Sequence, residues 1–276
     1  MIECQSSLRE HARGAALALM LGTLSACATA PGERPWGADA TVEPGWRRVG
    51  EAATGALKSP QFWGPLAAAA LFQIDNFDHR TSNWARSHTP IFGSQENAAR
   101  WSDRLRSASA YAYVATVLVT PSGDEPKEWL LDKLRGAAVG GAAIVVTDEE
   151  SALLKSATAR ERPNGQDTQS MPSSHASRSA VLTELAARNL ESVNIGQTPR
   201  TMLDVGLAAL TYGTAWARVE SGYHFPSDTL VGMSLGNLNG AFFNDAFLGI
   251  GRSSTKVSFA VTPVRGGAVL QFRVSP

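Results

Sequence analysis

The chain has 276 residues, and its 25 basic and 25 acidic side chains leave no net charge. This balance removes the basic surface that nucleic-acid binding normally needs to offset phosphates. A hydrophobic fraction of 43% is enough for a real core, whereas a mean hydropathy of -0.11 is low for a protein made mainly of membrane spans. The length allows one large domain or two small ones.

Residues 1–26 have the pattern of an export signal, in which basic residues precede a short apolar run, here at 15–24. The run is too short to cross a bilayer, which takes about 20 apolar residues. Leu-Ser-Ala-Cys at 24–27 resembles the bacterial lipobox, and this resemblance implies a lipid on Cys27 as a membrane anchor. With Ala28 next, it also implies a periplasmic protein held at the outer membrane of a Gram-negative bacterium. An ordinary secretion signal with an incidental cysteine is the alternative.

The sequence after the signal predicts a tether and then one helical domain. Residues 27–44 are rich in Pro, Gly and Ala, and residues 45–250 show the apolar spacing of helices. The expected helices are 45–57, 62–72, 95–118, 128–157, 175–190, 202–219 and 226–247. The apolar stretches at 136–146 and 207–217 are shorter than the roughly 18 residues of a span, so we expect buried helices of a soluble bundle.

Residues 251–276 change to a period of two. Apolar side chains alternate at 257–261 and again at 270–274, and Arg-Gly-Gly at 265–267 suits a turn. The pattern predicts a short C-terminal β-hairpin. An isolated hairpin is barely stable in water, so we expect it to dock on the helical body or on another surface.

Three segments of the helical domain gather basic residues, histidines and a carboxylate. They are Lys155-x6-Arg162-Pro163, Pro172-Ser173-Ser174-His175 and Arg218-x5-His224-x3-Asp228. In this order and at these separations they resemble the signature of the type-2 phosphatidic acid phosphatase family. This family shares its fold with vanadium-dependent haloperoxidases and bacterial non-specific acid phosphatases. The resemblance covers about 155–236, and the preceding helices fit more loosely.

The resemblance implies a mainly α helical bundle of that type and a metal-independent phosphatase without a cofactor. Its substrates would be phosphomonoesters or lipid pyrophosphates, and its partners the phosphate ester and, through the lipid anchor, a membrane. His224 would attack phosphorus to form a phosphohistidine, and His175 would protonate the leaving group and later activate water. Asp228 lies four residues after His224, on the same face if that turn is helical, where its carboxylate would fix the ring.

The remaining residues of the signature suit the binding of a phosphate. Lys155, Arg162 and Arg218 supply positive charge, and arginine binds phosphate oxygens in pairs. We expect Ser173 and Ser174 to present free backbone amides at the start of a helix, where anions bind. Because charge spreads over the phosphoryl oxygens during transfer, cations and amides at these places would stabilise the transition state.

Two residues depart from the family pattern, and two other functions stay open. Ser174 stands where the family usually has glycine, which puts the closeness of phosphate approach in doubt, and Ala217 stands where a serine often precedes the arginine. The same pocket could hold vanadate in a haloperoxidase, although such enzymes are generally larger. The chain could also be a non-catalytic, lipid-anchored envelope protein that uses its hairpin for interactions. Taken singly, each charged residue could have no role beyond stabilising the end of a helix through the helix dipole.

Overall fold

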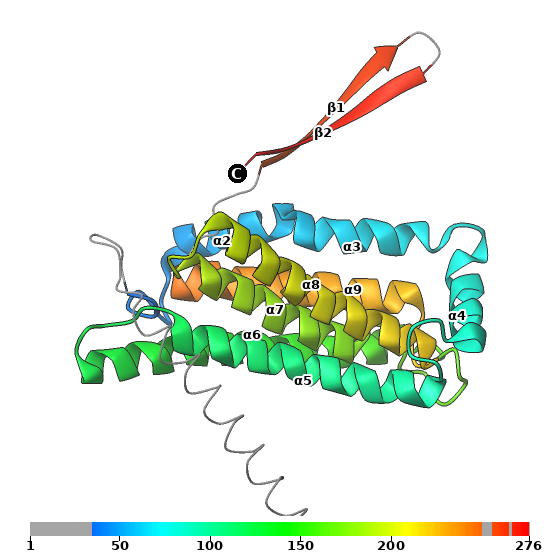
Figure 1. The fold of residues 1–276 in the computed structure, drawn as a ribbon, viewed down its shortest axis with the longest axis horizontal. Coiled ribbons are helices and arrows are strands. Elements are labelled where there is room, and N and C mark those ends of the chain that lie inside the picture. The colour runs from blue at the N-terminus through cyan, green and yellow to red at the C-terminus, as the bar shows by residue number, and fades with distance from the viewer. Residues whose placement is uncertain (1–34, 250–255, 265–266, 276) are drawn as a thin grey trace, which may run out of the picture.

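The computed structural model describes residues 35–249, 256–264 and 267–275. The predicted signal at 1–26, the lipidation site Cys27 and the centre of the predicted turn at 265–266 lie outside these ranges. The described chain is mainly helical, which confirms the predicted fold class (Figure 1). Its α-helices are α2 (Gly45–Lys58), α3 (Pro60–Leu71), α4 (Phe77–His88), α5 (Gln95–Val119), α6 (Pro126–Thr158), α7 (Ser174–Glu191), α8 (Gln197–Glu220) and α9 (Pro226–Phe243).

Local signals explain where most of these helices begin. Ser59, Ser94 and Ser173 each cap a helix by accepting a hydrogen bond from a backbone amide of its first turn. Proline occupies the first position of α3, α6 and α9, where its missing N–H costs nothing. The expected helix at 226–247 ends as an α-helix at Phe243 and continues as a π-helical turn, η2 (Asn244–Leu248).

Helix α4 was not predicted from the sequence. It follows a short 3-10 turn, η1 (Ile74–Asn76), and its buried residues are Asp78, Ser82 and Ala85. These lie three and four residues apart, as expected for one face of a helix, but none is a large apolar side chain. A search for apolar periodicity therefore passes over this helix. In Figure 1 it closes one end of the bundle.

Helix α7 is the centre of the bundle, and every residue from Ser179 to Leu190 is buried. It packs closely against α9, whose glycines at 232, 236 and 240 face it. A Cβ at Gly236 would come within 2.2 Å of the Ser177 carbonyl oxygen. Only glycine permits this approach, so the start of α7 and the start of α9 are held side by side.

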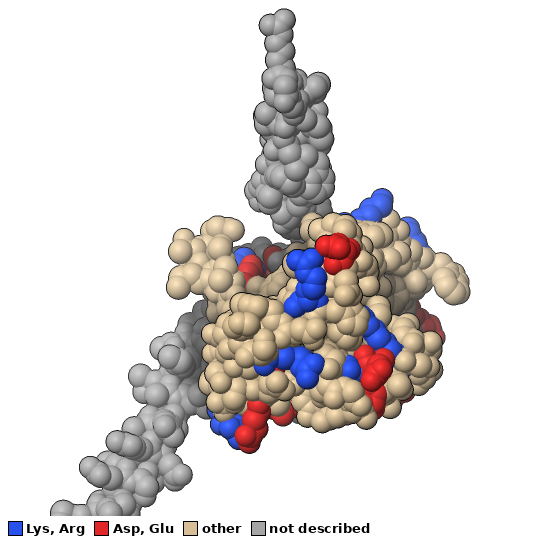
Figure 2. All heavy atoms as spheres, turned by 90° about the vertical axis from the view of Figure 1, so that its right-hand side faces the viewer, with Lys and Arg blue, Asp and Glu red and all other residues tan. Residues whose placement is uncertain are grey.

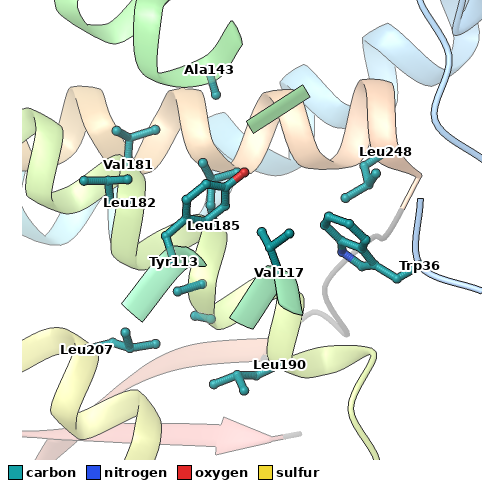
Figure 3. Packing of buried hydrophobic residues seen from close by; sticks show 12 residues of the cluster. Trp36, Tyr113, Val117, Ala143, Val181, Leu182, Leu185, Leu190, Leu207 and Leu248 are labelled. Atoms are coloured by element: carbon teal, nitrogen blue, oxygen red, sulfur yellow. The ribbon is translucent and has the colours of Figure 1, made fainter. Parts of the chain in front are cut away.

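The predicted tether is wrong for residues 35–44, because this segment packs on the bundle. Trp36 is only 2% exposed and donates its indole N–H to Asn189 Oδ1 over 3.1 Å. Its ring lies over Gly136 of α6, where a Cβ would be 2.2 Å away. Figure 3 shows the indole beside Val117 and Leu248 in the main apolar core. Burial of one large aromatic residue is thus enough to hold this segment on the bundle, although its neighbours are rich in Pro and Gly.

The C-terminal strands β1 (Lys256–Val264) and β2 (Gly267–Ser275) pair antiparallel, with Phe259 opposite Phe272. This agrees with the predicted hairpin. In Figure 1 the two strands lie apart from the helices, so the expected docking on the helical body is not seen for the described residues. Within the described ranges, no helix combines the length and the apolar character needed to cross a membrane.

Candidate active site

The structure brings the predicted site residues to one end of the bundle. Lys155 lies in the last turn of α6, His175 in the first turn of α7, Arg218 in the last turn of α8 and Asp228 in the first turn of α9. This is the end that α4 closes in Figure 1. Figure 2 looks onto it and shows basic and acidic side chains close to one another.

His224 is held in one tautomer by the backbone. Its ring is 2% exposed, and Nδ1 lies 2.6 Å from the carbonyl oxygen of Ser170. A carbonyl oxygen can only accept, so Nδ1 carries the hydrogen and the neutral ring keeps its lone pair on Nε2. Nε2 faces the guanidinium of Arg162, 3.5 Å from Nη1. The lone pair therefore points toward positive charge, as a nucleophile for a bound phosphate should.

The predicted bond from Asp228 to the His224 ring is not present. Asp228 Oδ2 accepts from the Phe225 amide over 2.8 Å and from the Ser170 hydroxyl over 2.6 Å. The four-residue spacing misled the prediction because α9 begins only at Pro226, so His224 precedes the helix. The carboxylate turns back to cap the helix, and its link to His224 runs through Ser170.

Three cations surround His224, as the sequence predicts. Arg162 donates from Nε to Asp167 Oδ1 over 2.6 Å and from Nη1 to the Tyr223 carbonyl over 3.2 Å. Lys155 Nζ donates to the Gln169 carbonyl over 2.6 Å. Burial, followed by Arg218, Lys155 and Arg162, lowers the pKa of His224 well below its usual value. The ring is therefore neutral at physiological pH and free to act as a nucleophile.

Arg218 is the most buried of the three cations, with 8% of its surface exposed. Its guanidinium lies 4.0 Å from the centre of the Tyr223 ring, and Nη1 lies 3.4 Å from Ser102 Oγ. Its Nε has no hydrogen-bond partner in the described part of the chain. Burial and then Arg162 lower its pKa to about 10, which still leaves it charged at neutral pH. An unpartnered buried donor of this kind is suited to an anion.

The prediction that Ser173 and Ser174 both present free backbone amides is correct only in part. The amide of Ser173 is not free, because it donates to the Asp228 carbonyl over 3.0 Å. Ser174 is the first residue of α7, and His175 is the second. Amides in the first turn of a helix have no acceptor within it. Of the two amides that the sequence predicted to be free, only that of Ser174 therefore remains available for an anion.

His175 has a partner that the sequence did not reveal. Its Nε2–H donates to Asp103 Oδ1 of α5 over 2.9 Å, which leaves Nδ1 for proton transfer. Burial and then Arg218 lower the pKa of His175 to about 4, while Asp103 opposes this shift. A bound anionic phosphate would also favour the protonated ring.

Sequence reasoning missed four residues that support the site, namely Asp78, Asp103, Arg160 and Ser170. Arg160 lies within the first motif, but its place there is not part of the signature. The others come from elements whose position depends on packing. His79 and His88, which match no motif, are exposed on α4. Among the described residues, no group of three or more His, Cys, Asp or Glu side chains is placed to hold a metal ion.

Comparison with known proteins agrees with this geometry. Residues 136–248 match the model of the PAP2 superfamily. This part of the chain is therefore similar to proteins of the PAP2 superfamily. The PAP2 segment contains every predicted residue of the signature, from Lys155 to Asp228, whereas Asp78 and Asp103 precede it. This match supports a phosphatase-type function.

The fold is also similar to that of a solved PAP2 protein, the transmembrane PAP2 type phosphatidylglycerolphosphate phosphatase from Bacillus subtilis. The TM-score is 0.50 at 20% sequence identity, over 70% of this chain and 97% of that chain. At this identity the likeness establishes the PAP2-type bundle alone. The search of curated proteins gave no match.

Proposed function

We propose that the chain hydrolyses phosphomonoesters or lipid pyrophosphates through a phosphohistidine on His224, with cations of the protein in place of a metal. The observation that supports this most directly is the ring of His224. Its Nδ1–H is fixed on Ser170, and its Nε2 faces Arg162. The histidine thus combines a defined lone pair with a site for the phosphoryl oxygens.

In the first step, the Nε2 lone pair of His224 attacks phosphorus while the bond from phosphorus to the leaving oxygen breaks. Protonated His175 gives its Nδ1 proton to that oxygen. Lys155, Arg162 and Arg218 hold the charge that spreads over the phosphoryl oxygens. In the second step, His175 takes a proton from water, the hydroxide attacks phosphorus, and the N–P bond breaks. Phosphate leaves, and the lone pair returns to Nε2.

We further propose that the mature protein is periplasmic and is held to the outer membrane by lipid on Cys27. The support is the signal-like sequence at 1–26 and the lipobox-like residues before Cys27. An anchor of this kind is compatible with both soluble and lipid-linked phosphates.

The test is hydrolysis of p-nitrophenyl phosphate and a panel of lipid phosphates by the purified chain without added metal. His224→Ala should lower kcat by about 10³-fold or more, since it removes the nucleophile. His88→Ala, an exposed histidine of α4, is the matched control and should keep full activity. Wild-type turnover by His224→Ala would refute the assignment. Halide oxidation with vanadate, in place of phosphate release, would favour the haloperoxidase.

A further inference from the structure

Arg160 joins two buried carboxylates behind the candidate active site. Its Nη1 donates to Asp228 Oδ1 over 2.6 Å, and its Nη2 donates to Asp78 Oδ2 over 2.7 Å. Asp78 is 2% exposed and Asp228 is fully buried. The guanidinium also lies 4.2 Å from the centre of the Phe225 ring, directly after His224. Two carboxylates buried this close together would repel each other without the cation between them.

Asp78 connects this cluster to α4. It accepts a hydrogen bond from the Ser227 amide over 2.9 Å and another from the Ser227 hydroxyl. Arg160 Nη1 also donates to Ser227 Oγ over 2.9 Å. Helix α4 therefore holds the first turn of α9, which carries Asp228.

Ser170 forms hydrogen bonds with both Arg160 and Asp228. Its amide donates to the Arg160 carbonyl over 2.9 Å, and its hydroxyl donates to Asp228 Oδ2 over 2.6 Å. Its own carbonyl accepts the Nδ1–H of His224. The other two hydrogen bonds are both donated by Ser170, one to the Arg160 backbone and one to the carboxylate that the Arg160 side chain neutralises.

We propose that Arg160 and Asp78 are positioning residues for His224: they hold Ser170, and through its carbonyl the imidazole, in the orientation needed for attack on phosphorus. This inference rests on the proposed function, since it assigns His224 as the nucleophile. Neither residue touches the substrate. Their loss should therefore lower kcat while changing KM much less.

The pH dependence provides a readout that simple loss of stability would not give. Burial raises the pKa of Asp228, Arg160 opposes this shift, and Asp78 adds to it. Lys155 of α6 also interacts with this carboxylate. A proton on Asp228 would displace one of its donors, so activity requires the charged form. Arg160→Gln should move the acidic limb of kcat to higher pH, and Asp78→Asn should move it to lower pH.

Arg188 offers a matched control. It lies near the other end of α7, is almost fully buried and also bonds two carboxylates, Glu184 and Asp245. Arg188→Gln therefore removes a comparable buried cation far from His224. It should lower stability without changing the pH profile of kcat.

The experiment measures kcat and KM for p-nitrophenyl phosphate across pH, using full-length variants whose helical circular dichroism matches that of the wild type. We expect Arg160→Gln and Asp78→Asn to lose about 10- to 100-fold in kcat at little change in KM. Arg160→Lys keeps the charge but not the planar fork and should recover part of this loss. The inference is overturned if both variants stay within twofold of wild-type kcat at every pH, or if Arg188→Gln loses as much. His224→Ala separates the two proposals, because turnover by that variant would instead refute the proposed function.

Discussion

Lys155 and Arg218, two of the three cations around His224, differ in how firmly they hold their charge. Burial, followed by the neighbouring Arg162, lowers the pKa of Lys155 to about 8. Arg218 is buried more deeply, yet its pKa stays at about 10. Of these two side chains, Lys155 is therefore the one that changes charge near physiological pH.

Binding of phosphate should consequently weaken as the pH rises through about 8. A bound anion favours charged Lys155 and raises its pKa, so the affinity is full below the pKa of the free site and falls above it. We expect KM to rise between pH 7 and pH 9 in the wild type. Lys155→Arg should flatten this rise, because arginine stays charged throughout. Steady-state kinetics over this range provide the check, and an equally steep rise in Lys155→Arg would contradict it.

The residues to which we assign direct roles could be predicted from the sequence, whereas the residues that we propose position them could not. Lys155, His175 and His224 belong to spaced motifs, and such spacing is visible in one sequence. Asp103 bonds His175, which lies 72 residues away in the sequence, and Asp78 bonds Arg160, which lies 82 residues away. These pairs depend on how α4 and α5 pack, which no local pattern encodes.

At the level of elements, the sequence predicted long apolar helices well. It failed where the buried side chains are polar or small, and where a single buried residue holds a segment. Helices α5, α7 and α8 lie where apolar spacing places them, within a few residues at each end. Helix α4 was missed because its buried face is made of Asp78, Ser82 and Ala85. The segment before α2 was read as a linker because a single tryptophan gives no periodicity.

Trp36 should therefore contribute strongly to stability although it precedes the first described helix. Trp36→Ala removes a fully buried indole and its bond to Asn189, and should lower the free energy of unfolding by about 3–5 kcal/mol. Trp46→Ala, at a residue that is 91% exposed, should change it by less than about 0.5 kcal/mol. Urea denaturation followed by circular dichroism measures both. Equal effects would mean that residues 35–44 are a free tether after all.

At the scale of the whole molecule, the candidate site and the docked N-terminal segment lie at opposite ends. Trp36 bonds Asn189 in the last turn of α7, whereas His175 begins the same helix. An α-helix of 18 residues is about 27 Å long. The lipid that we propose on Cys27 would lie eight residues before Pro35, the first described residue of the segment that docks at the end remote from the site.

This arrangement predicts that the anchor determines location and not turnover. Cys27→Ser should move the protein from the membrane pellet to the soluble fraction after cell lysis. The rate of p-nitrophenyl phosphate hydrolysis per molecule should stay the same, because the candidate site lies at the opposite end of α7 from Trp36 and its bond to Asn189. Fractionation with an activity assay measures both. A variant that stays in the pellet would refute lipidation as the means of attachment.

The close contact between α7 and α9 also limits how this protein could be re-engineered. Gly236 lies against the Ser177 carbonyl, and α7 is buried from Ser179 to Leu190. Larger side chains on these facing surfaces would therefore push the two helices apart and displace His175 or Asp228. Selection for new substrates should therefore yield changes in α4, in the start of α5 and in the loop at 159–173. A library confined to these segments, with Asp78, Asp103, Arg160, Arg162 and Ser170 kept, would leave the proposed chemistry intact and vary the surface around the site.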